Sequence, residues 1–150
     1  MSYIDNIISN CNAAKLAKPL NVIEVENLSE LDGIRKAIYI IEELEGNPEE
    51  TFLEFSRYKE KKERACAKLN FPSRVLYVGS STTDVKKRIK EHMGKGNNNT
   101  YALHLSHWFR GNYKVTVKQY DVTNEVLQII EDDLSDLLKP AFGKQGGNNK

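Results

Sequence analysis

Five side chains that could do acid–base or phosphate chemistry are spread along this 150-residue chain: Tyr39, Tyr77, Arg88, His92 and Glu131. Arg88 and His92 are four residues apart in a predicted helix, so they share one face of it. A guanidinium beside an imidazole can clamp a phosphate and carry a proton. The alternative for this pair is a solvated helix end with a capping histidine.

Tyr39 and Tyr77 each lie inside an apolar stretch that predicts a strand, over residues 36–41 and 75–78. For either tyrosine taken alone, a core position with its hydroxyl bonded at the sheet edge is the simpler interpretation. The functional interpretation depends on Gly79, which follows the second strand directly, and on the Arg88 and His92 pair after it.

Glu131 follows an apolar run in a predicted helix, at a position that would point toward the sheet or its edge. Carboxylates are rarely buried without a partner or a metal ion. A magnesium ligand is therefore one role for Glu131. The alternative is a surface glutamate on an acidic helix face shared with three aspartates, Asp132, Asp133 and Asp136.

The elements that must position these side chains follow from hydrophobic periodicity and from proline, glycine and capping signals. Helices are predicted over 3–16, 50–69, 85–92, 100–109 and 124–138. Strands are predicted over 36–41, 75–78 and 113–120, with 21–28 extended or irregular and 79–83 a turn. A small sheet packed by helices, class α+β, is the economical fold.

Charge is strongly segregated although the net charge is only +1. Residues 1–54 carry four basic and eleven acidic side chains, whereas residues 55–118 carry fifteen basic and four acidic ones. The basic middle third fits a polyanion footprint, and the alternative is a lysine-rich solvated helix. We expect DNA contacts from Lys59, Lys62, Lys86, Lys87, Lys90 and His104.

Cys11 and Cys66 lie far apart, which makes a structural zinc site or a disulfide framework unlikely and favours a reducing cytoplasm. The first twelve residues lack the basic leader of a secretory signal. His104 and His107 form a pair three residues apart, for which a buried or surface position is favoured over a metal site. We expect a cytoplasmic protein.

Four segments, in this order, resemble the GIY-YIG nuclease superfamily, closest in pattern to its restriction and homing endonuclease branches. They are Ala37-Ile38-Tyr39, Tyr77-Val78-Gly79, Arg88 with His92, and Glu131 followed by Lys139-Pro140. In the last segment a glutamate opens a Glu-x-x-Leu pattern and a Pro-x-aromatic step closes it. The resemblance covers residues 36–142.

The resemblance implies a small three-stranded antiparallel sheet flanked by helices, with an inserted basic helix at about 50–69. It implies one nuclease domain over 1–150, with an N-terminal helical or extended segment over 1–35, a core over 36–142 and a flexible tail over 143–150. It also implies a Mg²⁺-dependent DNA endonuclease, of restriction, homing or repair type, that hydrolyses phosphodiester bonds.

By the same resemblance, a phenolate-like tyrosine or His92 would activate the attacking water. Tyr39 would lie nearest that water, and Tyr77 would contact the water or the phosphate. Arg88 would hold the scissile phosphate, and Glu131 would bind one Mg²⁺ or another divalent cation.

The chain departs from the family pattern in three ways: Ala37 replaces the first glycine, Gly143 replaces the usual asparagine, and the tyrosines are unusually far apart. Asn148 or Asn149 could replace the asparagine only if the tail folds back. A non-catalytic nucleic-acid-binding module that keeps the fold is the alternative function, and an unrelated α+β domain is a third. The sequence leaves homodimerisation open.

Overall fold

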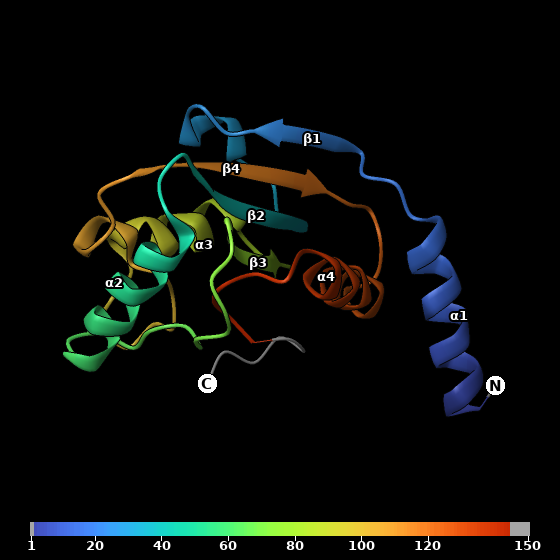
Figure 1. Ribbon diagram of the computed structural model, residues 1–150. Helices are drawn as coiled ribbons and strands as arrows, with labels where there is room; N and C mark the ends of the chain where they lie inside the picture. Colours follow the sequence, from blue (N-terminus) through green and yellow to red (C-terminus); the bar gives the residue numbers. More distant parts are fainter. Residues whose placement is uncertain (1, 145–150) are drawn as a thin grey trace.

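The centre of the computed structural model, which describes residues 2–144, is a four-stranded antiparallel sheet (Figure 1). The strand order is β1-β4-β2-β3, and the strands are β1 (Asn21–Glu24), β2 (Ala37–Leu44), β3 (Val75–Ser81) and β4 (Asn112–Gln119). The α+β class is confirmed, but the prediction of three strands is wrong because β1 adds a fourth.

The additional strand lies in the segment that was expected to be extended or irregular. β1 pairs with β4 from Asn21 opposite Gln119 to Glu24 opposite Thr116. Only Ile23 among its four residues is even half-buried. A strand on the sheet edge needs no buried face, so β1 lacks the apolar alternation that identifies strands in a sequence.

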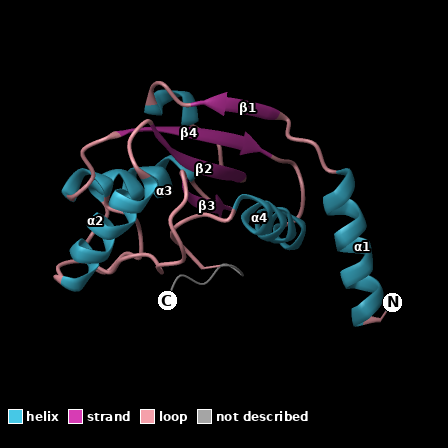
Figure 2. Ribbon diagram, in the orientation of Figure 1, coloured by secondary structure: helices cyan, strands magenta, loops and turns pink. Residues whose placement is uncertain are grey.

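Helices cover both faces of the sheet (Figures 1 and 2). The helical segments are α1 (Tyr3–Leu16), η1 (Leu28–Leu31), α2 (Pro48–Glu60), α3 (Val85–Lys90), η2 (Glu91–Lys95), η3 (Leu105–His107) and α4 (Asn124–Leu138).

Two apolar clusters lie on opposite faces of the sheet, and the interior strand β2 contributes to both. Tyr39 belongs to the larger cluster with Phe55 of α2 and Ile89 of α3. Ile38 belongs to the smaller cluster with Leu127 of α4. Because both faces are covered, the run over residues 37–41 is apolar without alternation, as expected for a central strand.

The basic helix predicted over 50–69 is shorter than expected. α2 begins at Pro48, capped by the Asn47 side chain, and ends at Glu60. Lys62 then has a φ of 55°, a left-handed conformation that no α-helix continues through. Beyond it the chain is extended, with Cys66 bridged to Ala102 in a β-contact. This packing of small and apolar residues overrides their helix propensity.

The helix predicted over 100–109 is also wrong, since only Leu105–His107 form a single 3₁₀ turn. His104 immediately before it has a φ of 52°, which interrupts any longer helix. The helix predicted over 85–92 is divided into α3 and the π-helical turn η2, where Gly94 has a φ of 126°.

The first and last predicted helices are confirmed as α1 and α4. α1 has a Ser2 capping box but buries none of its own residues. Within residues 2–144, no helix combines the length and the apolar character that spanning a bilayer requires.

Candidate active site

Strand register brings the two tyrosines together. In the β2–β3 pair, Tyr39 lies opposite Gly79 and Ile41 lies opposite Tyr77. The Tyr39 and Tyr77 rings are parallel, with centroids 6.0 Å apart and an interplanar angle of 4°. The prediction that residues 79–83 form a turn is wrong at its start, because β3 continues to Ser81.

Gly79 makes this tyrosine arrangement possible. A Cβ at Gly79 would lie 2.5 Å from Tyr39 Oη and 2.8 Å from Tyr77 Cε1. Both distances are shorter than side chains tolerate, so each ring packs against the bare Cα. Gly79 therefore fixes where the Tyr39 hydroxyl sits.

His92 lies behind Tyr39, fully buried. Its Nε2 is 3.0 Å from Tyr39 Oη, and its Nδ1 accepts the backbone N–H of Leu103 at 3.1 Å. Since Nδ1 is an acceptor, the neutral ring carries its proton on Nε2 and donates it to Tyr39. Burial, and then the charge of Arg88, hold the pKa of His92 well below its ordinary value.

The same burial acts on Tyr39 in the opposite sense. Desolvation raises the pKa of Tyr39 well above its ordinary value, and the neighbouring Tyr77 adds to the rise. Arg88 opposes it. In the free protein at neutral pH, Tyr39 is thus a phenol whose oxygen accepts the hydrogen bond from His92.

Arg88 projects from α3 beside the tyrosines. Its guanidinium donates to Glu91 Oε1 at 3.1 Å, to the carbonyl oxygen of Tyr101 at 2.9 Å and, more weakly, to Tyr77 Oη at 3.4 Å. These contacts fix the plane of the guanidinium. Arg88 is therefore held in place before any ligand arrives.

Glu131 reaches the same place from α4, on the other face of the sheet. Its side chain is buried beside β3, accepts a hydrogen bond from Ser80 Oγ, and accepts another from Gln128 Nε2 at 3.3 Å. Burial raises the pKa of Glu131, while the bonds from Ser80 and Gln128 oppose the rise. The hydrogen bonds from Ser80 and Gln128 thus hold the carboxylate with neutral donors, and the charge of Arg88 also favours its ionised form.

One cavity of about 280 Å³ joins four of the five predicted residues. Its walls are polar and come from β2, β3, α3, α4 and the segment after α4. The residues that line it include Tyr39, Tyr77, Ser80, Arg88, Gln128, Glu131 and Lys144. His92 does not line it but supports Tyr39 from behind.

The donor set at Glu131 fits a hard divalent cation that keeps most of its waters. Among residues 2–144 no three His, Cys, Asp or Glu side chains cluster as a closed metal cage. Mg²⁺ is usually bound by one or two carboxylates together with water and substrate phosphates. Glu131, with the Ser80 hydroxyl beside it, is the residue that would hold such a cation.

The lysines expected to contact DNA fall into two groups. On α3, Lys87 is exposed and lines another cavity together with Arg88 and Ser80. Lys86 is paired with Asp32 at 2.7 Å. Lys90 lines a further cavity along the same helix.

The second group lies at the end of α2. Lys59 and Lys62 line a cavity that reaches Tyr101, whose carbonyl oxygen binds Arg88. Lys59 also donates to the carbonyl oxygen of Ala67 at 3.1 Å. Lys87 therefore borders a cavity that contains Arg88, whereas Lys59 and Lys62 line a separate cavity linked to Arg88 through Tyr101.

His104, expected to contact DNA, lies in the interior of the protein. His104 is fully buried, and its Nε2 lies 2.9 Å from the carbonyl oxygens of Ala65 and Thr100. Burial also lowers the pKa of His104. The ring joins two loops and offers no charge to a phosphate.

Sequence reasoning missed Ser80, Gln128 and Lys144 as neighbours of the site. Gln128 had a usable signal, because it lies three residues before Glu131 on the same helix face. Ser80 follows Gly79 and therefore points to the opposite face of β3, toward α4. Only the packing of α4 on the sheet shows that Glu131 lies beside Ser80 on this face of β3.

The departure at Gly143 has a structural reason. Gly143 has a φ of 104°, and a Cβ there would lie 2.8 Å from Tyr77 Cε2, so asparagine does not fit this backbone. Its N–H donates to the carbonyl oxygen of Lys68 at 2.8 Å, which anchors a residue expected in the flexible tail. Asn148 and Asn149 lie outside the described residues.

Comparison with known proteins gives one match. The model of the GIY-YIG catalytic domain matches residues 55–145, a stretch that contains Tyr77, Arg88, His92 and Glu131. Tyr39 lies before the matched stretch, and the β2–β3 pairing and the hydrogen bond with His92 place it among the others. No curated protein and no solved structure matches this chain.

Proposed function

We propose, from the premise that this chain belongs to the GIY-YIG family, that it is a Mg²⁺-dependent DNA endonuclease that hydrolyses phosphodiester bonds. The observation that carries the proposal is that Tyr39, Tyr77, Arg88 and Glu131 line one polar cavity. A guanidinium, a carboxylate and two phenols around one cavity suit the charge and proton transfers of phosphodiester hydrolysis.

Tyr39 is the group best placed to take the proton of the attacking water. His92 is the weaker candidate, because Nε2 already carries a proton and Nδ1 accepts the buried N–H of Leu103. Protonating Nδ1 would leave that amide without a partner, which costs about 1–3 kcal/mol. His92 instead donates to the Tyr39 oxygen and so stabilises the phenolate that acts as base.

Arg88 and Tyr77 bind the scissile phosphate in this proposal. Arg88 already has fixed hydrogen bonds to Glu91 and Tyr101, so its charge needs no reorganisation when a phosphate enters. Preorganised donors of this kind stabilise the charge that develops on the phosphoryl oxygens. The Tyr77 hydroxyl, 3.4 Å from Arg88, faces the same oxygens.

Glu131 and Ser80 would hold the divalent cation. When bound, such a cation supplies Lewis-acid stabilisation of the leaving 3′ oxygen. Glu131 is kept near the cavity by Gln128 and Ser80 even without the cation. The exposed lysines on α3 and at the end of α2 bind the flanking phosphates, a contribution that weakens with salt.

The test is cleavage of supercoiled plasmid and of branched DNA with Mg²⁺. Wild type should cut, whereas Glu131→Gln should bind DNA without cutting it, and chelation of the metal should stop wild type. Asp133→Asn, an exposed acid on the same helix, is the matched control and should cut normally. Salt-dependent DNA binding without cutting by wild type would favour the non-catalytic binding module.

A further inference from the structure

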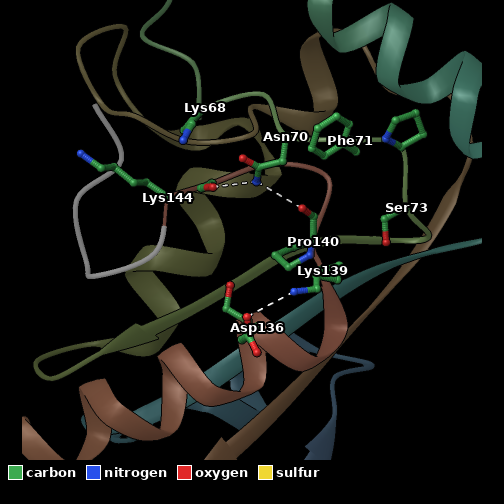
Figure 3. A pocket seen from close by; sticks show the side chains of 11 residues that line it. Lys68, Asn70, Phe71, Ser73, Asp136, Lys139, Pro140 and Lys144 are labelled. Carbon is green, nitrogen blue, oxygen red and sulfur yellow. Dashed lines mark hydrogen bonds and ion pairs between the residues drawn. The ribbon is translucent and has the colours of Figure 1, made fainter.

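A second cavity, shown in Figure 3, has a volume of about 460 Å³. It adjoins the candidate active site. Gly143 lines it while packing its bare Cα against Tyr77, and Lys144 lines both this cavity and the one with Arg88 and Glu131. The two cavities are therefore neighbours along one surface. A volume of this size lies in the range of sites for single small ligands, about 300–1,000 Å³.

An exposed aromatic ring forms part of this second cavity. Phe71 is 81% exposed, the most exposed of the large apolar side chains within residues 2–144. Residue 71 lies between Asn70 and Pro72, both of which also line the cavity. A single exposed apolar side chain is common on protein surfaces. Phe71 is of interest because its exposed ring borders a cavity.

The backbone that presents Phe71 is held firmly. The N–H of Asn70 donates to the carbonyl oxygen of Ala141 at 2.8 Å. Its side-chain amide donates to the carbonyl oxygens of Pro140 at 3.2 Å and Gly143 at 2.8 Å, as Figure 3 shows. The ring thus stands on an anchored segment, which lowers the entropy lost when a ligand stacks on it.

The charge around the cavity is positive. Lys68, Lys139 and Lys144 line it, and its one acid, Asp136, is paired with Lys139 at 3.2 Å. Lys68 and Lys144 both lie on the side of the cavity away from Ser73 (Figure 3). Lysines beside an exposed aromatic ring are the combination that binds single-stranded nucleic acid, by backbone charge and base stacking.

We infer that this cavity binds one unpaired nucleotide next to the scissile phosphate, with its base on Phe71 and its phosphate near Lys68 and Lys144. The inference rests on the proposed nuclease function and specifies its substrate class. A base inside a duplex is covered on both faces, so it must leave the stack before it can lie on Phe71. The preferred substrate is therefore DNA with unpaired nucleotides beside the cut, such as a flap or a branch.

The test compares binding of a blunt duplex with binding of the same duplex carrying a single-stranded tail. The protein is the full chain with Glu131→Gln, which prevents cutting, and the measurement is fluorescence anisotropy of labelled DNA. The tailed DNA should bind more tightly, and Phe71→Ala should remove about 5- to 100-fold of that affinity while leaving duplex binding unchanged. Phe71→Trp should retain the preference, because indole also stacks.

Tyr3→Ala is the matched control, since Tyr3 is 79% exposed on α1 and lines no part of the cavity. It should leave both affinities unchanged. Equal binding of the two DNAs, or a tail preference that survives Phe71→Ala, would overturn the inference and leave the nuclease proposal standing. Failure to bind either DNA would overturn both.

Discussion

Gly79→Ala is the substitution for which the structure gives the displacement of the Tyr39 hydroxyl. The new Cβ would lie 2.5 Å from Tyr39 Oη and 2.6 Å from Tyr39 Cζ. Because ordinary van der Waals contact begins near 3.4 Å, the hydroxyl would have to move by about 0.9 Å. It has little room, since Tyr77 is also 2.8 Å from the new atom and His92 is buried behind Tyr39.

Two consequences follow for the variant. Overpacking of this kind costs about 1–3 kcal/mol of unfolding free energy, or about 2–12 °C in Tm for a chain of this size. A misplacement of about 1 Å in a catalytic group costs about 100-fold in rate. Single-turnover DNA cleavage well below Tm, with thermal unfolding followed by circular dichroism, measures both effects separately.

Gly111→Ala is the control for adding a methyl group to a glycine. Its new Cβ would contact the far end of the Phe109 ring at 3.0 Å, just before β4. Phe109 is half-buried but lies outside the candidate active site, and its ring has to give way by only about 0.4 Å, so this variant should retain its rate. If Gly79→Ala cleaves at the wild-type rate with an unchanged Tm, the packing of Tyr39 on a bare Cα does not position the base.

Three further outcomes are expected. Because burial raises the pKa of Tyr39, the cleavage rate should increase about tenfold per pH unit through the neutral and mildly alkaline range; a flat profile would exclude a phenolate base. The lowered pKa of His92 means that only the unfolded chain binds its proton in mild acid. Unfolding free energy should therefore fall below about pH 6.5, and His92 should contribute about 1.4 kcal/mol per pH unit to this slope. Urea titrations should show that His92→Gln reduces the slope by that amount and leaves the share of buried His104, whose pKa is also lowered. Thr51→Val should destabilise by about 1–3 kcal/mol, since it removes the 2.7 Å bond to the buried Glu43 carboxylate; an unchanged urea midpoint would contradict this.

The family and the elements that carry its motifs could be predicted from the sequence. β2, β3 and α4 have strong local signals: β-branched apolar runs in the strands, and a regular apolar stripe in the helix. The match of the GIY-YIG catalytic domain to residues 55–145 confirms the family. Arg88 and His92 both contact the tyrosines, Arg88 through Tyr77 and His92 through Tyr39, although the predicted helix is divided between them.

The errors arose where tertiary contacts override local preference. Residues 61–69 consist of good helix formers, yet Lys62 turns left-handed and Ala67 is fully buried in an extended segment. The sequence left His104 either buried or at the surface, and two backbone carbonyls hold its ring in the interior. β1 lacks an alternating pattern because an edge strand with exposed side chains needs none.

The contacts of the site that could not be predicted from the sequence depend on strand register and on helix packing. The position of Tyr39 above Gly79 requires the β2–β3 register, and the role of Ser80 requires the packing of α4 on the other face. The donor role of His92 depends on the Leu103 amide, eleven residues further along the chain. None of these contacts has a local sequence pattern.

The most direct test of the central claim is single-turnover cleavage of DNA with Mg²⁺ by wild type and Tyr39→Phe. Tyr39→Phe keeps the ring that packs on Gly79 and removes only the oxygen that accepts the hydrogen bond from His92. The account predicts that wild type cuts, and that the variant binds DNA equally but cuts about 10²- to 10⁴-fold more slowly. Equal cutting by the variant would contradict the role of Tyr39, and no cutting by wild type with any divalent metal would contradict the nuclease function.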